Sequence, residues 1–449
     1  WWYLIRNWNG ISFILTIKKD VFKVIYIKDL ITKKMNKKEL TEDEIDFFIS
    51  SYYRNEISEA QASALMSLMH IFGLSENETA YLVNAMAQTG DELELYRISN
   101  KLVDIHPIGG ISDKITIILL SILNGLNIPI VKIAGRELGL EDRLSSIEGY
   151  QVENDVLNFK ECLVANNIAI LNEFENMVPV ENKIYNLRKD IACDHDIKLI
   201  AISIMSQKIA IGCKNIFFEI TYGENAYVKT LEEAKILSKY LVNIGSEMLR
   251  NVHCCITELN EPRGIAFGNI IEMREIFEAL RGNMAKDVQE LVLNFGNNIL
   301  QLLGYKNKNE NFAQIKNVID SGRALQSFKK IIEIRGGNFS ILQNNVTCQY
   351  HIPIISSNEG YIEKIDVNKV RCLAKYLNAI RGSKNDKIDI GAGMKFYKKI
   401  GDYIKKGEII GYIETNNEVK IEEATKQMKD SITLSQKRIR VKNYVVYEI

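Results

Sequence analysis

Residues 103–114 read VDIHPIGGISDK, and they join a short apolar run to the helix-like segment 115–123. Two adjacent glycines before a helix let backbone N–H groups point at an anion, where the helix dipole helps to hold it. A plain turn uses the same residues. Around this stretch, apolar segments at 128–133, 168–171 and 216–220 alternate with helix-length segments. This alternation predicts a mostly parallel sheet with helices on its faces.

The segment before the sheet is helical in pattern. Its amphipathic runs each open on a capping box, in which a hydroxyl residue is followed three positions later by Glu or Gln. The three pairs are Thr41 with Glu44, Ser58 with Gln61, and Ser75 with Glu78. Gly73 stands where a helix would end. From His351 onward, short strands punctuated by glycine predict a compact β-rich unit.

Composition limits the possible partners. Lys and Arg number 57 and balance 57 Asp and Glu, so no global positive field exists to hold nucleic acid or an anionic membrane. Seven cysteines without CxxC spacing favour reduced thiols in a cytoplasm, and the absence of an 18-residue apolar run excludes a membrane-spanning helix. We expect a cytoplasmic protein that binds a small molecule.

Four blocks together resemble one family. Residues 103–114 resemble the KHSTGGxGD loop of the thymidine and pyrimidine-nucleoside phosphorylases. Residues 134–139, AGRELG, are similar to SGRGLG, while 185–188, YNLR, and 200–208, IAISIMSQK, resemble YxLRD and SIMSKK. The resemblance runs from about residue 27 to residue 415. It implies displacement of a pyrimidine from C1 of ribose or deoxyribose by phosphate, which needs a held anion and a donor to the base carbonyl.

The resemblance implies an α/β fold with a small helical domain, a larger α/β domain and a C-terminal β-rich lobe. The expected boundaries are an atypical extension over 1–25, a helical domain over 26–100 joined by 179–208, an α/β domain over 101–178 and 209–345, and a lobe over 346–449. It also implies a homodimer formed through the helical domain.

Residues of the pyrimidine-binding half are retained. By resemblance, His106 is the catalytic donor to a base carbonyl, Tyr185 packs on the base, and Arg188 donates to a carbonyl. Ser203 matches the serine that hydrogen-bonds the base, and Ile204 forms an apolar wall beside it. The expected partner is therefore a pyrimidine base or nucleoside.

Most residues of the phosphate-binding half are replaced. The family's loop lysine, serine and threonine are Ile105, Pro107 and Ile108, its serine before GR is Ala134, and the second lysine of SKK is Gln207. The TGGT that should follow Leu140 is deleted. Losing four hydrogen bonds to a charged group costs on the order of 6–12 kcal/mol.

The resemblance implies that part of the phosphate site is retained. Its residues are Gly109, Gly110, Thr116 and Lys208. We expect phosphate binding to be weak or absent. Lys114, Lys132 and Arg143 are possible substitute ligands.

The family also holds a monovalent cation near this loop. Ala266 and Glu272 match two of its ligand positions, but Ser112 replaces the loop glycine and Lys114 the hydroxyl ligand. An ammonium group could neutralise Glu272 without a metal. We therefore expect no cofactor, with potassium as the alternative.

Three functions fit these observations. A catalytically impaired homologue that retains pyrimidine binding or acts as a structural partner is favoured, because the losses concentrate in the phosphate half. The alternatives are a working phosphorylase with substitute anion ligands, and a decayed protein without a role.

Overall fold

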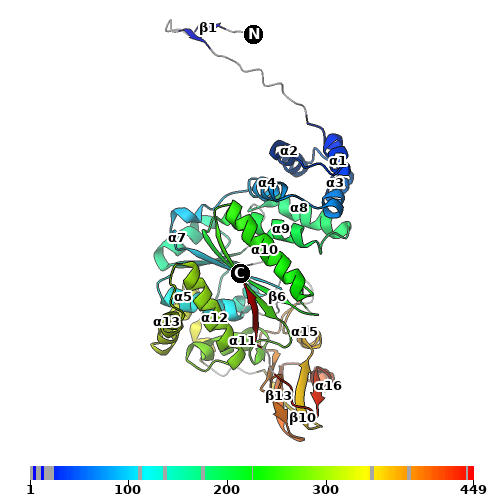
Figure 1. Cartoon of the computed structure of the whole chain (residues 1–449). Helices are drawn as coiled ribbons and strands as arrows, with labels where there is room; N and C mark the ends of the chain where they lie inside the picture. Colours follow the sequence, from blue (N-terminus) through cyan, green and yellow to red (C-terminus); the bar gives the residue numbers. More distant parts are fainter. Residues whose placement is uncertain are drawn as a thin grey trace.

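The structure is a computed structural model, and it describes residues 4–6, 12–14, 25–109, 114–134, 139–172, 177–224, 226–343, 348–381, 386–440 and 443–449. Within the expected N-terminal extension it describes two strands, β1 (Leu4–Arg6) and β2 (Ser12–Ile14), which pair antiparallel. The remaining described residues form a helical bundle, a central α/β domain and a C-terminal β lobe (Figure 1).

The helical bundle begins with α1 (Ile27–Met35), α2 (Glu42–Tyr53), α3 (Glu59–Phe72) and α4 (Glu76–Ala87). All three expected capping boxes are present, and Gly73 ends α3 with a φ of 75°. Two later helices, α8 (Pro179–Asp190) and α9 (Ile197–Ile211), pack against α2, α3 and α4. A buried ion pair of 2.7 Å joins Lys34 to Glu78 inside this bundle.

The central sheet has the order β15-β7-β6-β3-β4-β5. Its parallel strands are β3 (Val103–Ile108), β4 (Ile130–Ala134), β5 (Ile168–Asn172), β6 (Asn215–Tyr222) and β7 (Asn251–Glu258). Strand β15 (Val445–Glu448) pairs antiparallel with β7. The chain therefore returns to the sheet at its end, whereas the sequence reasoning placed all of 346–449 in the lobe.

Helices cover both faces of this sheet. Helix α9 and α10 (Leu231–Glu247) contribute to the apolar core on one face, and α5 (Lys114–Gly125), α11 (Asn269–Leu280) and α12 (Lys286–Leu302) to the core on the other. The other helices of the domain are α6 (Leu140–Ser145), α7 (Val156–Asn166), α13 (Lys308–Asp320) and α14 (Arg323–Glu333), with 3₁₀ turns η1 (Leu95–Arg97) and η2 (Phe339–Leu342).

Strand β3 divides its side chains between these two faces. Side chains alternate along a strand, so Val103 and Ile105 pack with the α5 side, while Ile108 packs with the α9 and α10 side. Asp104 and His106 share the face of Ile108. The candidate site residues of this strand thus lie on the face of the sheet that α9 and α10 cover.

The β lobe contains two antiparallel sheets. One has the order β8-β11-β13-β9, from Ala266–Phe267, Gly393–Phe396, Ile409–Thr415 and Tyr350–Ile355. The other has the order β12-β10-β14, from Tyr403–Ile404, Gly360–Ile365 and Ile432–Ser435. Helices α15 (Val367–Tyr376) and α16 (Ile421–Asp430) and the turn η3 (Glu418–Lys420) complete it. Strand β8 pairs with β11 of the lobe and is followed directly by α11 of the α/β domain, so it joins the two parts.

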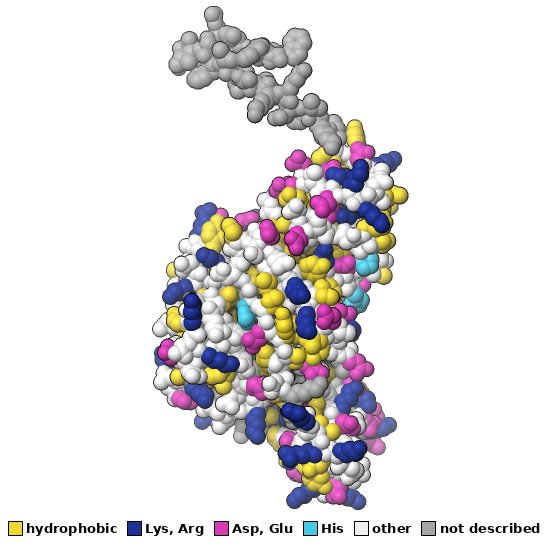
Figure 2. Space-filling model, in the orientation of Figure 1, with side chains coloured by type: hydrophobic (Ala, Val, Ile, Leu, Met, Phe, Trp, Pro, Cys, Tyr) yellow, Lys and Arg dark blue, Asp and Glu magenta, His cyan; other side chains and the backbone are white. Residues whose placement is uncertain are grey.

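Basic and acidic side chains are mixed over the face shown in Figure 2. In the part of the chain that the structure describes, no helix has both the length and the apolarity needed to span a bilayer.

Candidate functional site

His106 lies on β3 with its ring against Phe218, at 5.7 Å between centroids and in an edge-on arrangement. Burial, followed by the positive charges of Lys208 and Lys132, holds the pKa of His106 well below its ordinary value of 6.5. Its Nδ1 is buried without a hydrogen-bond partner among the described residues. The imidazole is therefore neutral near pH 7 and can donate one hydrogen bond and accept another.

Arg188 is almost completely buried on α8, with 1% of its surface exposed. Its guanidinium donates to three backbone carbonyls in and after the α8–α9 turn, those of Cys193 at 3.3 Å, Asp194 at 3.1 Å and Leu199 at 3.1 Å. A guanidinium has five N–H groups. These bonds orient the side chain and use three of its five N–H groups.

Ser203 on α9 donates its hydroxyl proton to the carboxylate of Glu181. Glu181 is buried in the first turn of α8. Because the proton points at Glu181, the lone pairs of the Ser203 oxygen remain as acceptors. Arg188 and Ser203 thus present a donor beside an acceptor.

The structure brings together some of the expected base-binding residues and not others. Arg188 and Ser203 line one small pocket, whose other walls include Met66, Leu82 and Met86 of the bundle. His106 and Tyr185 do not line it. Tyr185 is partly exposed on α8, with the ammonium of Lys189 over its ring at 4.4 Å, and Ile204 packs at the margin of the apolar core.

Tyr227 contacts both halves of the candidate site: the loop that begins at Gly109 after β3, called the glycine loop below, and the turn that binds Arg188. Gly109 has a φ of +79°, and a Cβ there would lie 3.1 Å from the Thr221 carbonyl and 3.6 Å from the Tyr227 Cβ. The Tyr227 hydroxyl donates to the Asp194 carbonyl at 2.8 Å, which also accepts from Arg188. Sequence reasoning missed Tyr227. The available signal was an aromatic residue directly after the glycine-containing turn that follows β6.

The positions of the phosphate half are mostly apolar. Ile105, Ile108 and Ala134 are buried in apolar clusters, with 2%, 5% and 3% of their surfaces exposed. Thr116 is buried on α5. Gly110 lies outside the described residues. Lys208 is buried on α9 and pairs with Asp104 at 2.7 Å.

The possible substitute cations also have partners. Lys114 pairs with Glu275 at 2.5 Å, and Arg143 binds Glu272 through two bonds of 2.8 and 3.1 Å. The Lys132 ammonium donates to the Ile105 carbonyl at 3.2 Å. Each of these three cations therefore already has a partner in the fold.

The expected cation position contains an ammonium group. Lys114 Nζ donates to the Ala266 carbonyl at 2.7 Å and lies 3.9 Å from Glu272. Glu275, three residues beyond Glu272 on α11, was missed by the sequence reasoning and is the closer carboxylate. Since the Lys114 ammonium uses the Ala266 carbonyl and the Glu275 carboxylate, these residues do not fit an additional potassium ion.

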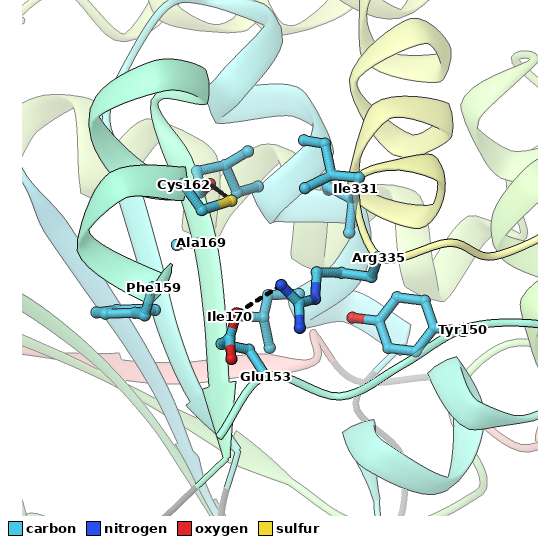
Figure 3. A pocket seen from close by; sticks show the side chains of 10 residues that line it. Tyr150, Glu153, Phe159, Cys162, Ala169, Ile170, Ile331 and Arg335 are labelled. Carbon is cyan, nitrogen blue, oxygen red and sulfur yellow. Dashed lines mark hydrogen bonds and ion pairs between the residues drawn. The ribbon is translucent and has the colours of Figure 1, made fainter. Parts of the chain in front are cut away.

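A second pocket lies beside β5, at one edge of the central sheet. Its lining includes Tyr150, Cys162 and Ile331, and Arg335 reaches across it to Glu153 at 2.6 Å (Figure 3). None of the residues predicted for the functional site lines this pocket.

Three family models match the chain. They are the glycosyl transferase family helical bundle domain over residues 28–90, the glycosyl transferase family a/b domain over 99–325, and the pyrimidine nucleoside phosphorylase C-terminal domain over 361–435. Together they span the three parts of the fold.

Individual relatives also match most of the chain. The pyrimidine-nucleoside phosphorylase of Staphylococcus aureus (strain bovine RF122 / ET3-1) is 34% identical over 418 residues, covering 91% of this chain and 96% of the relative. The protein of the same name from Staphylococcus haemolyticus (strain JCSC1435) is 34% identical over 414 residues, covering 90% and 95%. Anthranilate phosphoribosyltransferase from Thermus thermophilus has a similar fold, with a TM-score of 0.55 at 14% identity over 68% of this chain and 98% of that one.

Proposed function

Because this chain belongs to the pyrimidine-nucleoside phosphorylase family, we propose that it binds a pyrimidine base or nucleoside and that its phosphorolysis is severely impaired. The proposal separates the two halves of the family's site. The pyrimidine half keeps its hydrogen-bonding groups, whereas the described positions of the phosphate half are mostly apolar, and its lysine, Lys208, is paired with Asp104.

The engagement of the buried cations carries this proposal. Lys114 pairs with Glu275, Arg143 with Glu272, and Lys208 with Asp104, at distances of 2.5 to 2.8 Å. Moving any of these side chains to a phosphate would leave a buried carboxylate without its counter-charge. Breaking such a pair costs about 3–5 kcal/mol, which opposes recruitment of the cation.

The polarity of the pyrimidine half favours uracil and thymine over cytosine. Arg188 can donate to a ring carbonyl, and the Ser203 oxygen can accept from a ring N–H, since its own proton is held by Glu181. Uracil and thymine present a carbonyl beside an N–H. Cytosine presents a ring nitrogen acceptor beside an amino donor, so it would leave buried polar groups unpaired.

A phosphorolysis assay tests the proposal. With thymidine or uridine and excess phosphate, base should be released at least about 10⁴-fold more slowly than by a phosphorylase that carries the KHSTGG loop and both lysines of SKK, because four or more charged hydrogen bonds are missing. A turnover within the ordinary range of about 1–10³ s⁻¹ would overturn it.

An active phosphorylase is the second candidate, and Lys132 favours it. Its ammonium lies 3.2 Å from the carbonyl of Ile105, the position of the family's loop lysine. If Lys132 holds phosphate, Lys132→Met should abolish a measurable phosphorolysis activity. If activity is already negligible in the unmodified protein, this candidate fails.

We further propose a homodimer formed through the helical bundle. Support comes from large apolar side chains exposed on its first helices and their turns, including Met35, Ile71 and Phe72. Sedimentation should show a dimer that Ile71→Glu with Phe72→Glu converts to a monomer. A monomeric unmodified chain would contradict this assembly.

A further inference from the structure

A buried charge cluster lies where α5, α6 and α11 meet β8. It consists of Lys114, the first residue of α5, Arg143 on α6, and Glu272 and Glu275 on α11. The side chains of Lys114 and Glu272 are 0% exposed, and those of Arg143 and Glu275 are 4% and 8% exposed. Little solvent is available to screen these charges.

The Lys114 ammonium is bound as a small cation would be. It donates to the Ala266 carbonyl at 2.7 Å and to Glu275 Oε2 at 2.5 Å, while Glu272 Oε2 lies at 3.9 Å. Carbonyl and carboxylate oxygens are the ligands that hard metal cations take in proteins. A tethered ammonium therefore uses the same kind of oxygen donors as a free cation.

Backbone N–H groups at the start of β8 also donate to the Glu275 carboxylate. Glu275 accepts from the Ile265 N–H at 2.7 Å and from the Ala266 N–H at 2.9 Å. Gly264 has a φ of +67°, and a Cβ there would lie 2.1 Å from Glu275 Oε1. Lys114 thus connects the start of α5, directly after the glycine loop, to β8 and α11.

Among the described residues, the two carboxylates of the cluster face two cations. Arg143 neutralises Glu272 through bonds of 2.8 and 3.1 Å, and Lys114 neutralises Glu275. A metal ion added here would have to share its oxygen ligands with the Lys114 ammonium, and two positive charges so close together in a buried region repel each other strongly.

We propose that Lys114 is a built-in replacement for a monovalent cation, which positions α5 against β8 and α11 and makes the protein independent of potassium. The inference rests on the family to which the chain belongs and on this geometry. It does not depend on whether phosphorolysis is impaired, because its readout is thermal stability.

The unmodified protein gives the first test. Its Tm should be the same within about 1 °C in potassium chloride, sodium chloride and choline chloride at equal ionic strength, because the Lys114 ammonium already occupies the oxygen ligands that a cation would use. A potassium-specific rise of several degrees that grows with concentration would overturn the proposal.

Lys114→Ser gives the second test. Removing the ammonium should lower Tm by several degrees and should create a response that the unmodified protein lacks. Potassium or ammonium should restore about half or more of the loss in a concentration-dependent manner, whereas choline, which is too large, should not.

Lys34→Ser is the matched control, since it breaks another buried lysine–glutamate pair, Lys34 with Glu78 at 2.7 Å. It should lower Tm without any specific recovery by potassium. The proposal is wrong if Lys114→Ser responds no more than Lys34→Ser. It is also wrong if Lys114→Ser stays unfolded in every salt, because a vacated site with these oxygen ligands should accept the cation.

Discussion

The buried ion pair between Lys208 and Asp104 can be used to test whether this lysine stabilises the fold or is available to bind an anion. Lys208→Met removes an ammonium that lies 2.7 Å from Asp104 Oδ2, in a pair whose side chains are 2% and 0% exposed. Asp104 Oδ1 has no hydrogen-bond partner in the described chain. An unpaired buried carboxylate costs about 3–5 kcal/mol. At about 2–4 °C per kcal/mol for a domain of 150–250 residues, Tm should fall by about 6–20 °C.

A double-mutant cycle measures the interaction free energy between Lys208 and Asp104 separately from their other contacts. Thermal melts followed by circular dichroism would compare Lys208→Met, Asp104→Asn and the double variant. The double variant should recover most of the loss, because neither charge then remains buried and unpaired. The reasoning fails if Lys208→Met changes stability by less than about 1 kcal/mol, or if the double variant is no more stable than Lys208→Met. Lys208 would then be available to an anion.

Three further measurements address the pyrimidine half and the core. Glu181→Gln should weaken uracil binding about tenfold, or 1.4 kcal/mol, because the Ser203 hydroxyl loses its charged acceptor; equal calorimetric affinities would contradict this. Burial lowers the folded-state pKa of His106 below its unfolded value, so stability should fall as pH drops below about 6.5. His106→Gln should reduce that decline by up to about 1.4 kcal/mol per pH unit in urea titrations, and an unchanged slope would show that His106 is not held neutral. Exposed Cys372 should react with a thiol reagent well before Cys254 and Cys255, whose pKa values burial raises, and equal rates would contradict this order.

Local signals explain why much of the fold could be predicted. The hydroxyl and the Glu or Gln of each capping box lie three residues apart, so a short stretch of sequence contains the whole interaction. The strands at 130–134 and 168–172 were likewise recognisable as apolar runs between helices. Strand β15 was not, because its pairing with β7 joins segments far apart in the chain.

The sequence predicted which positions form the candidate site, but not which groups those side chains contact. Motif matching identified Arg188 and Ser203, yet the partners that fix their polarity lie on other turns and helices. Glu272 and Glu275 stand one helical turn apart on α11, so spacing alone could not decide which carboxylate meets Lys114. The tertiary contacts of Lys114 with Ala266 and Glu275 decide it.

Calorimetric titration of uracil or thymine, with and without phosphate, measures both halves of the site at once. We expect a dissociation constant no weaker than about 1 mM, since several hydrogen bonds and ring packing contribute to binding. We also expect phosphate to leave this affinity unchanged, because the anion half has too few donors to couple with the base half. Absence of base binding would contradict the retained pyrimidine half. A tenfold tightening by phosphate, or about 1.4 kcal/mol of coupling, would contradict the loss of the phosphate half.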